Sequence, residues 1–174
     1  NASIFEYDNI GTVSVDSWDR HIGSNLKAPL FLIQDFAKQV ISQAEDEQGE
    51  NLPVANIVNI VDQRVMRKTP EFITYTLAKA GLWTLTQTAA QALAPRIRVN
   101  AIGPGPTLKG FRQSTEHFKK QRENTILKRG SSEKEIVEAL NFILRTSSMT
   151  GQLICIDGGQ HLAWKTADIL GVEP

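Results

Sequence analysis

The sequence contains one cysteine, Cys155, and only three histidines in its 174 residues. A single cysteine excludes a disulfide framework within the chain and a cysteine-based zinc site, and it agrees with the reducing conditions of the cytoplasm. The histidines, His21, His117 and His161, lack the spacing of metal ligands. We therefore expect a cytoplasmic protein with no metal site, in which the histidines have surface or packing roles.

An excess of charge of one sign is also missing, because Lys plus Arg and Asp plus Glu each number 19. This balance gives no electrostatic reason to expect nucleic acid or an anionic membrane as a partner. No apolar run approaches the ~18 residues of a membrane span. The hydrophobic share of 41% is ordinary for a globular protein, and the length suffices for one domain with a real core, so we expect residues 1–174 to form a single domain.

Apolar periodicity predicts alternating helices and strands. Helical spacing covers 16–44, 71–92 and 131–144, and strand-like runs cover 54–61, 94–102 and 152–157. Polar loops are expected at 45–51, 63–70 and 103–107, and short helices within 108–128. Strands that alternate with longer helices indicate an α/β fold, with a parallel sheet covered by helices on both faces.

Local signals refine the helix ends. Asp16 is a suitable N-cap for the first helix, and Pro29 predicts a kink or a tight join within it. Ser132 followed by Glu135 has the spacing of a capping box at the start of the third helix.

Asp62 follows the apolar run Val54 to Val61 directly. A carboxylate at the end of a buried strand is costly unless it has partners. A turn or a helix cap is the simplest explanation, because Asp is common in both. The alternative is a functional role, since ligands of α/β proteins bind at the carboxyl ends of parallel strands.

Tyr75 and Lys79 lie four residues apart in the second long helix, which places both side chains on one helix face. A free tyrosine has a pKa of about 10 and is a poor proton donor near neutral pH. A fixed ammonium lowers that pKa, so the pair would form a tuned general acid. The alternative is an exposed tyrosine and lysine on a solvated helix.

The residues after this pair extend the pattern, because YTLAK is followed by R-V-N-A-I-G-P-G at 98–105. This succession resembles the short-chain dehydrogenase/reductase family, which has a doubly wound, Rossmann-like fold. The opening Asn1, Ala2 and Ser3 look like the family's N-N-A-G segment, and IDGG at 156–159 looks like its closing strand and turn. The resemblance covers nearly the whole chain and implies an NAD(P)-dependent oxidoreductase.

One departure narrows the resemblance. The family usually has a serine thirteen residues before the catalytic tyrosine, and here that residue is Asp62. An Asp at this position is similar to the pteridine reductases and the related dihydromonapterin or dihydrofolate reductases. Ser3 and Phe5 stand where pteridine reductases have a serine and a ring-stacking phenylalanine. The runs 23–37 and 158–162 also look like that subgroup.

The resemblance implies a role for each matching residue. Tyr75 would donate a proton, Lys79 would lower its pKa and hold the nicotinamide ribose, and Asn25 would hold the water of a proton relay. Asp62 would orient the substrate and supply the second proton, because reduction of a C=N bond requires protonation at nitrogen. The substrate site would comprise Ser3, Phe5, Asp62 and Tyr75, and the cofactor site Asn1, Ala2, Ser3, Tyr75, Lys79, Pro104, Gly105 and Thr107.

The family's glycine-rich phosphate turn, G-x-x-x-G-x-G, does not occur in the sequence. Because this turn precedes the segment that matches Asn1 to Ser3, we expect the intact protein to have further N-terminal residues. NADPH is the cofactor that the resemblance implies, and NADH is not excluded. The family builds tetramers from the helices at 16–40 and 71–92, so a homotetramer is expected.

Two other functions stay open. A short-chain reductase acting on another substrate, such as a ketone, a 3-oxoacyl group or a sugar, would share the Tyr75–Lys79 pair. A non-catalytic interaction module would bind no nicotinamide. The basic run His117 to Arg122 is a solvated helix face or, within the family's substrate loop at about 104–130, a lid over cofactor phosphates.

Overall fold

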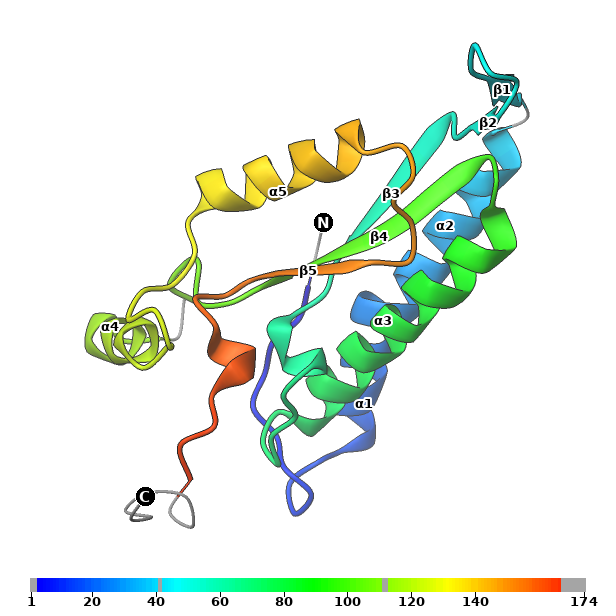
Figure 1. Cartoon of the computed structure of the whole chain (residues 1–174). Coiled ribbons are helices and arrows are strands. Elements are labelled where there is room, and N and C mark those ends of the chain that lie inside the picture. Colours follow the sequence, from blue (N-terminus) through cyan, green and yellow to red (C-terminus); the bar gives the residue numbers. More distant parts are fainter. Residues whose placement is uncertain (1–2, 41, 111–112, 167–174) are drawn as a thin grey trace.

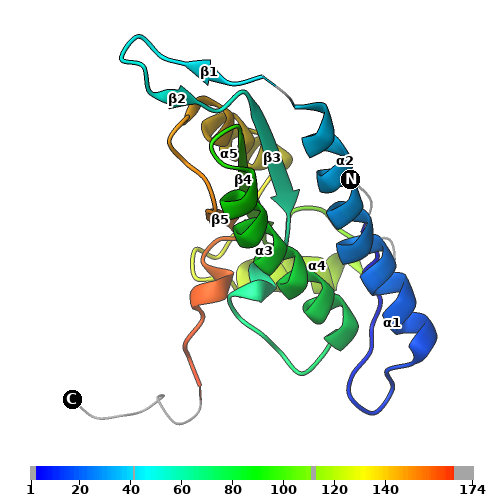
Figure 2. The same cartoon turned by 90° about the vertical axis from the view of Figure 1, so that its right-hand side faces the viewer.

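The computed structural model describes residues 3–40, 42–110 and 113–166. One continuous helical segment comes first, formed by α1 (Val15–Ile22), a π-helical turn (Gly23–Lys27) and α2 (Ala28–Gln39). Figures 1 and 2 show α1 and α2 following one another along one side of the molecule. The irregularity expected at Pro29 is the π turn just before it, since proline has no N–H to donate to the preceding turn.

Both predicted ends of this helix are wrong. Ser14, and not Asp16, is the N-cap, and its hydroxyl oxygen accepts from the backbone N–H of Ser17 at 3.1 Å. Asp16 lies in the first helical turn, where its negative charge interacts favourably with the positive end of the helix dipole. The helix ends at Gln39 rather than at residue 44, because Ala44 already pairs with Leu52 in a short hairpin.

This hairpin, β1 (Ala44–Glu45) and β2 (Asn51–Leu52), encloses most of the segment that was predicted as a loop. The Asp46 carboxylate orders its tip, because one of its oxygens accepts from the backbone N–H groups of Gln48 and Glu50, each at 2.9 Å. Gly49 supplies the left-handed conformation that the turn needs, with φ of 77°.

Three parallel strands form the main sheet in the order β3 (Ala55–Ile60), β4 (Ile97–Pro104) and β5 (Leu153–Ile156). The central strand β4 is buried from Ile97 to Gly103. Its alternating side chains face opposite layers of helix. This arrangement confirms the predicted α/β fold with a parallel sheet.

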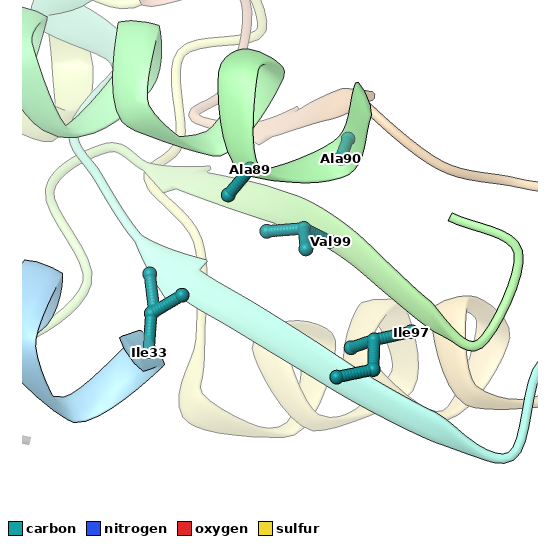
Figure 3. Packing of buried hydrophobic residues seen from close by; sticks show 5 residues of the cluster. All are labelled: Ile33, Ala89, Ala90, Ile97 and Val99. Carbon is teal, nitrogen blue, oxygen red and sulfur yellow. The ribbon is translucent and has the colours of Figure 1, made fainter. Parts of the chain in front are cut away.

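Helices cover both faces of the sheet, as Figure 1 shows. On one face α2 and α3 (Ile73–Leu93) pack against Ile97 and Val99, and Figure 3 shows Ala89 and Ala90 of α3 beside Val99. On the other face α5 (Glu133–Arg145) packs against Ile102. The small alanine side chains let α3 approach the sheet closely, which fixes the position of the residues at its start.

The remaining elements lie near the carboxyl ends of the strands. They are the 3₁₀ helices η2 (Gln63–Val65) and η3 (Gln160–Leu162) and the helix α4 (Thr115–Glu123). The capping box of α5 is confirmed, because Ser132 and Glu135 exchange both of its hydrogen bonds. Within the described residues, no helix is long and apolar enough to cross a membrane, and no group of three or more metal-ligating side chains is present.

Candidate active site

The candidate site begins where β3 ends, at Asp62. One carboxylate oxygen of Asp62 accepts a hydrogen bond from the Tyr75 hydroxyl at 2.9 Å, and the other accepts from the backbone N–H of Arg64 at 2.7 Å. The second contact makes Asp62 the N-cap of η2. Asp62 is therefore a helix cap, as the simplest explanation predicted, and also the partner of the tyrosine that the sequence singled out.

Tyr75 lies in the first turn of α3 and is 6% exposed. Burial raises the pKa of Tyr75 well above 10, and the charge of Asp62 and its hydrogen bond raise it further. Arg64 acts in the opposite direction, to a smaller extent. The phenol is consequently protonated near neutral pH and donates its hydrogen to Asp62.

Lys79 stands one turn further along α3, with its ammonium nitrogen 5.7 Å from the centre of the Tyr75 ring. This nitrogen donates to the carbonyl oxygen of Ile60 at 2.9 Å. Burial lowers the pKa of Lys79, and the charge of Asp62 partly opposes this shift. Burial and the Asp62 carboxylate dominate the pKa of the phenol in this arrangement, and the effect expected of Lys79 on that pKa stays a prediction.

Asn25 is 2% exposed and lies within the π turn. Its side-chain oxygen accepts from the Ile4 N–H at 3.0 Å, and its side-chain nitrogen donates to the Ile4 carbonyl at 2.8 Å. These two bonds fix the segment that carries Ser3 and Phe5. Asn1 and Ala2, which were assigned to the cofactor site, lie outside the described residues.

The Phe5 ring stacks on Phe72, with ring centres 4.4 Å apart and planes inclined by 9°. It also meets the Tyr75 ring edge-on at 4.7 Å. Phe72 has a left-handed backbone with φ of 57°, which is unusual for a bulky residue. Sequence reasoning missed Phe72, because its ring reaches Phe5 through a left-handed N-cap that no local pattern indicates.

Sequence reasoning also missed a buried polar network behind Tyr75. The Asp8 carboxylate accepts from the Ser17 hydroxyl at 3.0 Å, from the Thr74 backbone N–H at 3.3 Å and from the Thr74 hydroxyl. His21, which is fully buried, contacts the Thr74 hydroxyl through Nδ1 at 2.9 Å and accepts the Glu6 backbone N–H at Nε2. The packing role expected for His21 is thus a polar one, and Asp8 supplies the side-chain acceptor that Phe72, as N-cap of α3, cannot supply.

Replacement of Asp8 by asparagine in the full-length protein is expected to lower the free energy of unfolding by about 2 kcal/mol near neutral pH, because buried donors lose a charged acceptor. Burial raises the pKa of Asp8, but hydrogen bonds from Thr74 and Ser17 outweigh burial and leave it below 3.8. The folded pKa lies below the unfolded one, so the carboxylate stabilises the fold above pH 3.8 and this contribution is lost as pH falls further.

Urea unfolding of wild type and Asp8→Asn at several pH values measures this difference. Exposed Asp19 on α1 provides a matched Asp19→Asn control, which should change stability little. A destabilisation by Asp8→Asn that is the same above and below pH 3.8 would contradict the role given to the charge.

Pro104, Gly105 and Thr107 lie at the carboxyl end of β4, beside β5. The Gly105 N–H donates to the Ile156 carbonyl at 2.9 Å, and a side chain at Gly105 would meet the Asp157 backbone at 2.6 Å. The Thr107 hydroxyl donates to the Gly105 carbonyl at 3.1 Å and lies 2.5 Å from the Ser131 hydroxyl. These residues form a wall next to the strand ends, and no described hydrogen bond joins them to Tyr75.

Replacement of Gly105 by alanine is expected to destabilise the full-length protein by about 1–3 kcal/mol, because the new methyl group would overlap backbone atoms rather than a flexible side chain. Gly110 gives a control, since a methyl group there would meet nothing within 4 Å. Thermal unfolding of the two variants tests the prediction, which fails if Gly105→Ala and Gly110→Ala unfold at the same temperature.

Two hollows in the described part of the chain lie along β5, and neither is lined by Tyr75 or Asp62. One, of about 660 Å³, is lined by residues that include Trp83, Cys155 and His161. The other, of about 290 Å³, adjoins Gly158. His161 lines both hollows, and its Nδ1 lies 2.7 Å from Oδ2 of the buried Asp157. The convergence of titratable side chains, rather than a cavity, marks the candidate site.

Comparison with known proteins places this geometry in a family. The family model described as enoyl-(acyl carrier protein) reductase matches residues 1–161. Dihydromonapterin reductase of Citrobacter koseri is 30% identical over 115 residues, which are 66% of this chain and 48% of that protein. The chain therefore spans about half the length of the curated relatives that it matches.

Solved structures agree more closely. FolM alternative dihydrofolate reductase 1 from Brucella suis, in complex with NADP, is 44% identical with a TM-score of 0.86, and covers 97% of this chain and 65% of its own. The Brucella canis protein of the same name, also with NADP, is 46% identical with a TM-score of 0.85, over 97% of this chain and 64% of its own. The chain belongs to the short-chain dehydrogenase/reductase family.

Proposed function

We propose that this chain carries the catalytic residues of an NADPH-dependent reductase that reduces a C=N bond of a pterin or a dihydrofolate-like substrate. The observation that carries the proposal is the hydrogen bond from Tyr75 to Asp62, at the carboxyl end of β3 and beside the stacked rings of Phe5 and Phe72. The names of the similar proteins, dihydromonapterin reductase and alternative dihydrofolate reductase, support the substrate class, and the NADP complexes support the cofactor.

The residues fit a nicotinamide nucleotide. Lys79 uses one of its three N–H donors on Ile60, so others can bind ribose hydroxyls. Gly105 keeps the wall beside β5 free of a side chain, and Pro104 and Thr107 flank it. When bound, the cofactor supplies the hydride. Tyr75, Lys79, Pro104, Gly105 and Thr107 are the described residues that we propose to hold it.

The proton chemistry falls to Tyr75 and Asp62. Tyr75 is protonated near neutral pH, because burial and Asp62 hold its pKa well above 10, which also makes it a weaker acid than a free tyrosine. The nitrogen that gains negative charge as the hydride adds is a strong base, and we propose that Tyr75 supplies the proton for it through Asp62. Asp62 holds the phenol in place and passes that single proton to the ring nitrogen, so that one hydride and one proton reduce one C=N bond. Asn25 is proposed to hold both the Ile4 segment and the water of a proton relay.

Phe5 is proposed as the platform for the flat substrate ring. One face of Phe5 is covered by Phe72, yet the side chain is still 53% exposed. The face away from Phe72 is therefore the one that a pterin ring would stack on. Ser3 is exposed beside this ring and would contact the polar rim of the substrate.

Oxidation of NADPH by the full-length protein tests the proposal, with dihydrobiopterin, dihydrofolate and a small diketone compared side by side. We expect turnover of one or both pteridines and little turnover of the diketone. Equal rates on all three, or activity on the diketone alone, would replace this proposal by a general carbonyl reductase. An absence of nicotinamide binding would favour a non-catalytic module.

We also propose that the intact protein is a cytoplasmic homotetramer. Support for the assembly comes from large apolar side chains that remain exposed on the described helices: Trp18 on α1, Leu30 and Phe31 on α2, and Leu77 on α3. The cysteine content supports the location, since the single Cys155 is a free thiol, as is usual in a reducing compartment. Sedimentation of the full-length protein tests the tetramer.

A further inference from the structure

Arg64 is a cation that the candidate site holds in place but that the proposed reaction does not use. Its backbone N–H donates to Asp62, and its guanidinium carbon lies 5.2 Å from the centre of the Phe72 ring. Phe72 in turn stacks on Phe5. Phe72 therefore contacts both the guanidinium and Phe5, the proposed substrate platform.

The hydrogen bonds of Arg64 leave its charge without a negative partner. One of its terminal nitrogens donates to the Thr69 hydroxyl at 2.5 Å and to the Glu71 carbonyl at 3.4 Å, which are both neutral acceptors. Among the residues that the structure describes, its Nε is buried without a hydrogen-bond partner, and no ion pair includes Arg64. The buried Nε is out of reach of a ligand, but the second terminal nitrogen, Nη2, has no described hydrogen bond and is not buried, so it is the donor open to an anionic oxygen.

The position of the charge also couples it to the reacting groups. Arg64 lowers the pKa of Tyr75, against the larger effect of burial and Asp62, so its field reaches the phenol. Arg64 contacts Phe72 and has no described contact with Phe5, so a flat ring stacked on Phe5 does not itself touch the guanidinium. A substituent on that ring must be long enough to reach past Phe72, and it pairs with the guanidinium if it ends in a negative group.

We infer that Arg64 determines substrate preference by binding a carboxylate at the end of the substrate's side chain. This inference rests on the proposed function. The proposed function gives no preference between dihydrofolate and a short-chain dihydropterin, whereas Arg64 would favour dihydrofolate. The aminobenzoyl-glutamate substituent of dihydrofolate is long and ends in carboxylates. A dihydropterin with a short, neutral hydroxylated chain has no group that uses the guanidinium. Arg64 thus favours pteridines with an anionic tail.

The test compares the full-length wild type with Arg64→Gln and Arg64→Lys on dihydrofolate and dihydrobiopterin. Arg64→Gln is expected to lower the ratio of kcat/KM for dihydrofolate to kcat/KM for dihydrobiopterin about tenfold, mainly through the KM for dihydrofolate, because a charge-assisted contact is lost. Arg64→Lys keeps the charge and should retain part of the preference. Taking a ratio cancels any effect of Arg64 on Tyr75 that both substrates share.

Three results would overturn the inference. If the ratio of the two kcat/KM values in Arg64→Gln stays within twofold of wild type, Arg64 does not bind the substituent of dihydrofolate. An equal loss on both substrates would give Arg64 a structural role near Asp62. A rise in the KM for NADPH alone would show that the anion is a phosphate of the cofactor.

Binding separates this inference from the proposed function. If the wild type reduces neither pteridine, the proposed function fails, and titration of folate and biopterin by quenching of tryptophan fluorescence then decides the role of Arg64. Selective weakening of folate binding in Arg64→Gln supports the inference. Equal affinities of wild type and Arg64→Gln for folate overturn it.

Discussion

Tyr75→Phe is expected to lower kcat for a dihydropterin by roughly 10²–10⁴, the usual contribution of a positioned general acid. The variant removes only the hydroxyl that donates to Asp62 and retains the ring that Phe5 meets edge-on. Binding of the pteridine should therefore change much less than kcat. Steady-state kinetics with NADPH and the full-length protein measure both quantities.

Tyr7 provides a matched control for this variant. It is the other tyrosine of the chain, it is 58% exposed, and its ring meets Phe72 rather than Tyr75. Tyr7→Phe should keep kcat close to the wild-type value. If Tyr75→Phe retains wild-type kcat, Tyr75 is not the proton donor, and the catalytic proposal must be rebuilt around another group.

Asp62→Ser is expected to reduce activity on a dihydropterin about a hundredfold, because a hydroxyl cannot replace a carboxyl as proton donor to nitrogen. Serine is itself a good N-cap, so the cap of η2 on the Arg64 N–H should persist. The loss would then be chemical rather than structural. Kinetics and unfolding measured on the same preparation separate the two causes.

Asp62→Asn adds an electrostatic readout to this test. The charge of Asp62 and its hydrogen bond both raise the pKa of Tyr75, so the neutral amide should let that pKa fall. The alkaline limb of the absorbance titration of the tyrosines would move to lower pH. Full activity of Asp62→Ser on dihydropterins would instead match a reductase that needs only a neutral donor there.

The main features of the fold could be predicted from the sequence because they rest on local signals. The apolar run before Asp62, the buried β4 segment and the Ser132–Glu135 box each fold as their spacing indicates. The wrong boundaries lie where one local signal competes with another or where a strand pairing ends the helix. Ser14 replaces Asp16 as the cap, and the pairing of Ala44 with Leu52 shortens the first helix.

The site was predictable in composition but not in its electrostatics. Spacing linked Asp62, Tyr75 and Lys79, and the structure brings them together. The direction in which the pKa of Tyr75 shifts was not predictable, because it depends on burial and on the opposing charges of Asp62 and Arg64. The roles of Asp8 and His21 were not predictable either, because both depend on tertiary structure. These residues contact Thr74 only after α1 packs beside the start of α3.

The π turn at Gly23–Lys27 has a consequence for how this helical segment tolerates change in length. A π turn holds one residue more than an α-helical turn would. Deletion of one residue there would restore a regular helix and rotate α1 against α2 by about 100°. Asn25 would then leave Ile4, and His21 would turn away from Thr74. The extra residue thus sets the rotation of α1 relative to α2, so a single-residue deletion in this turn is expected to separate Asn25 and His21 from their partners.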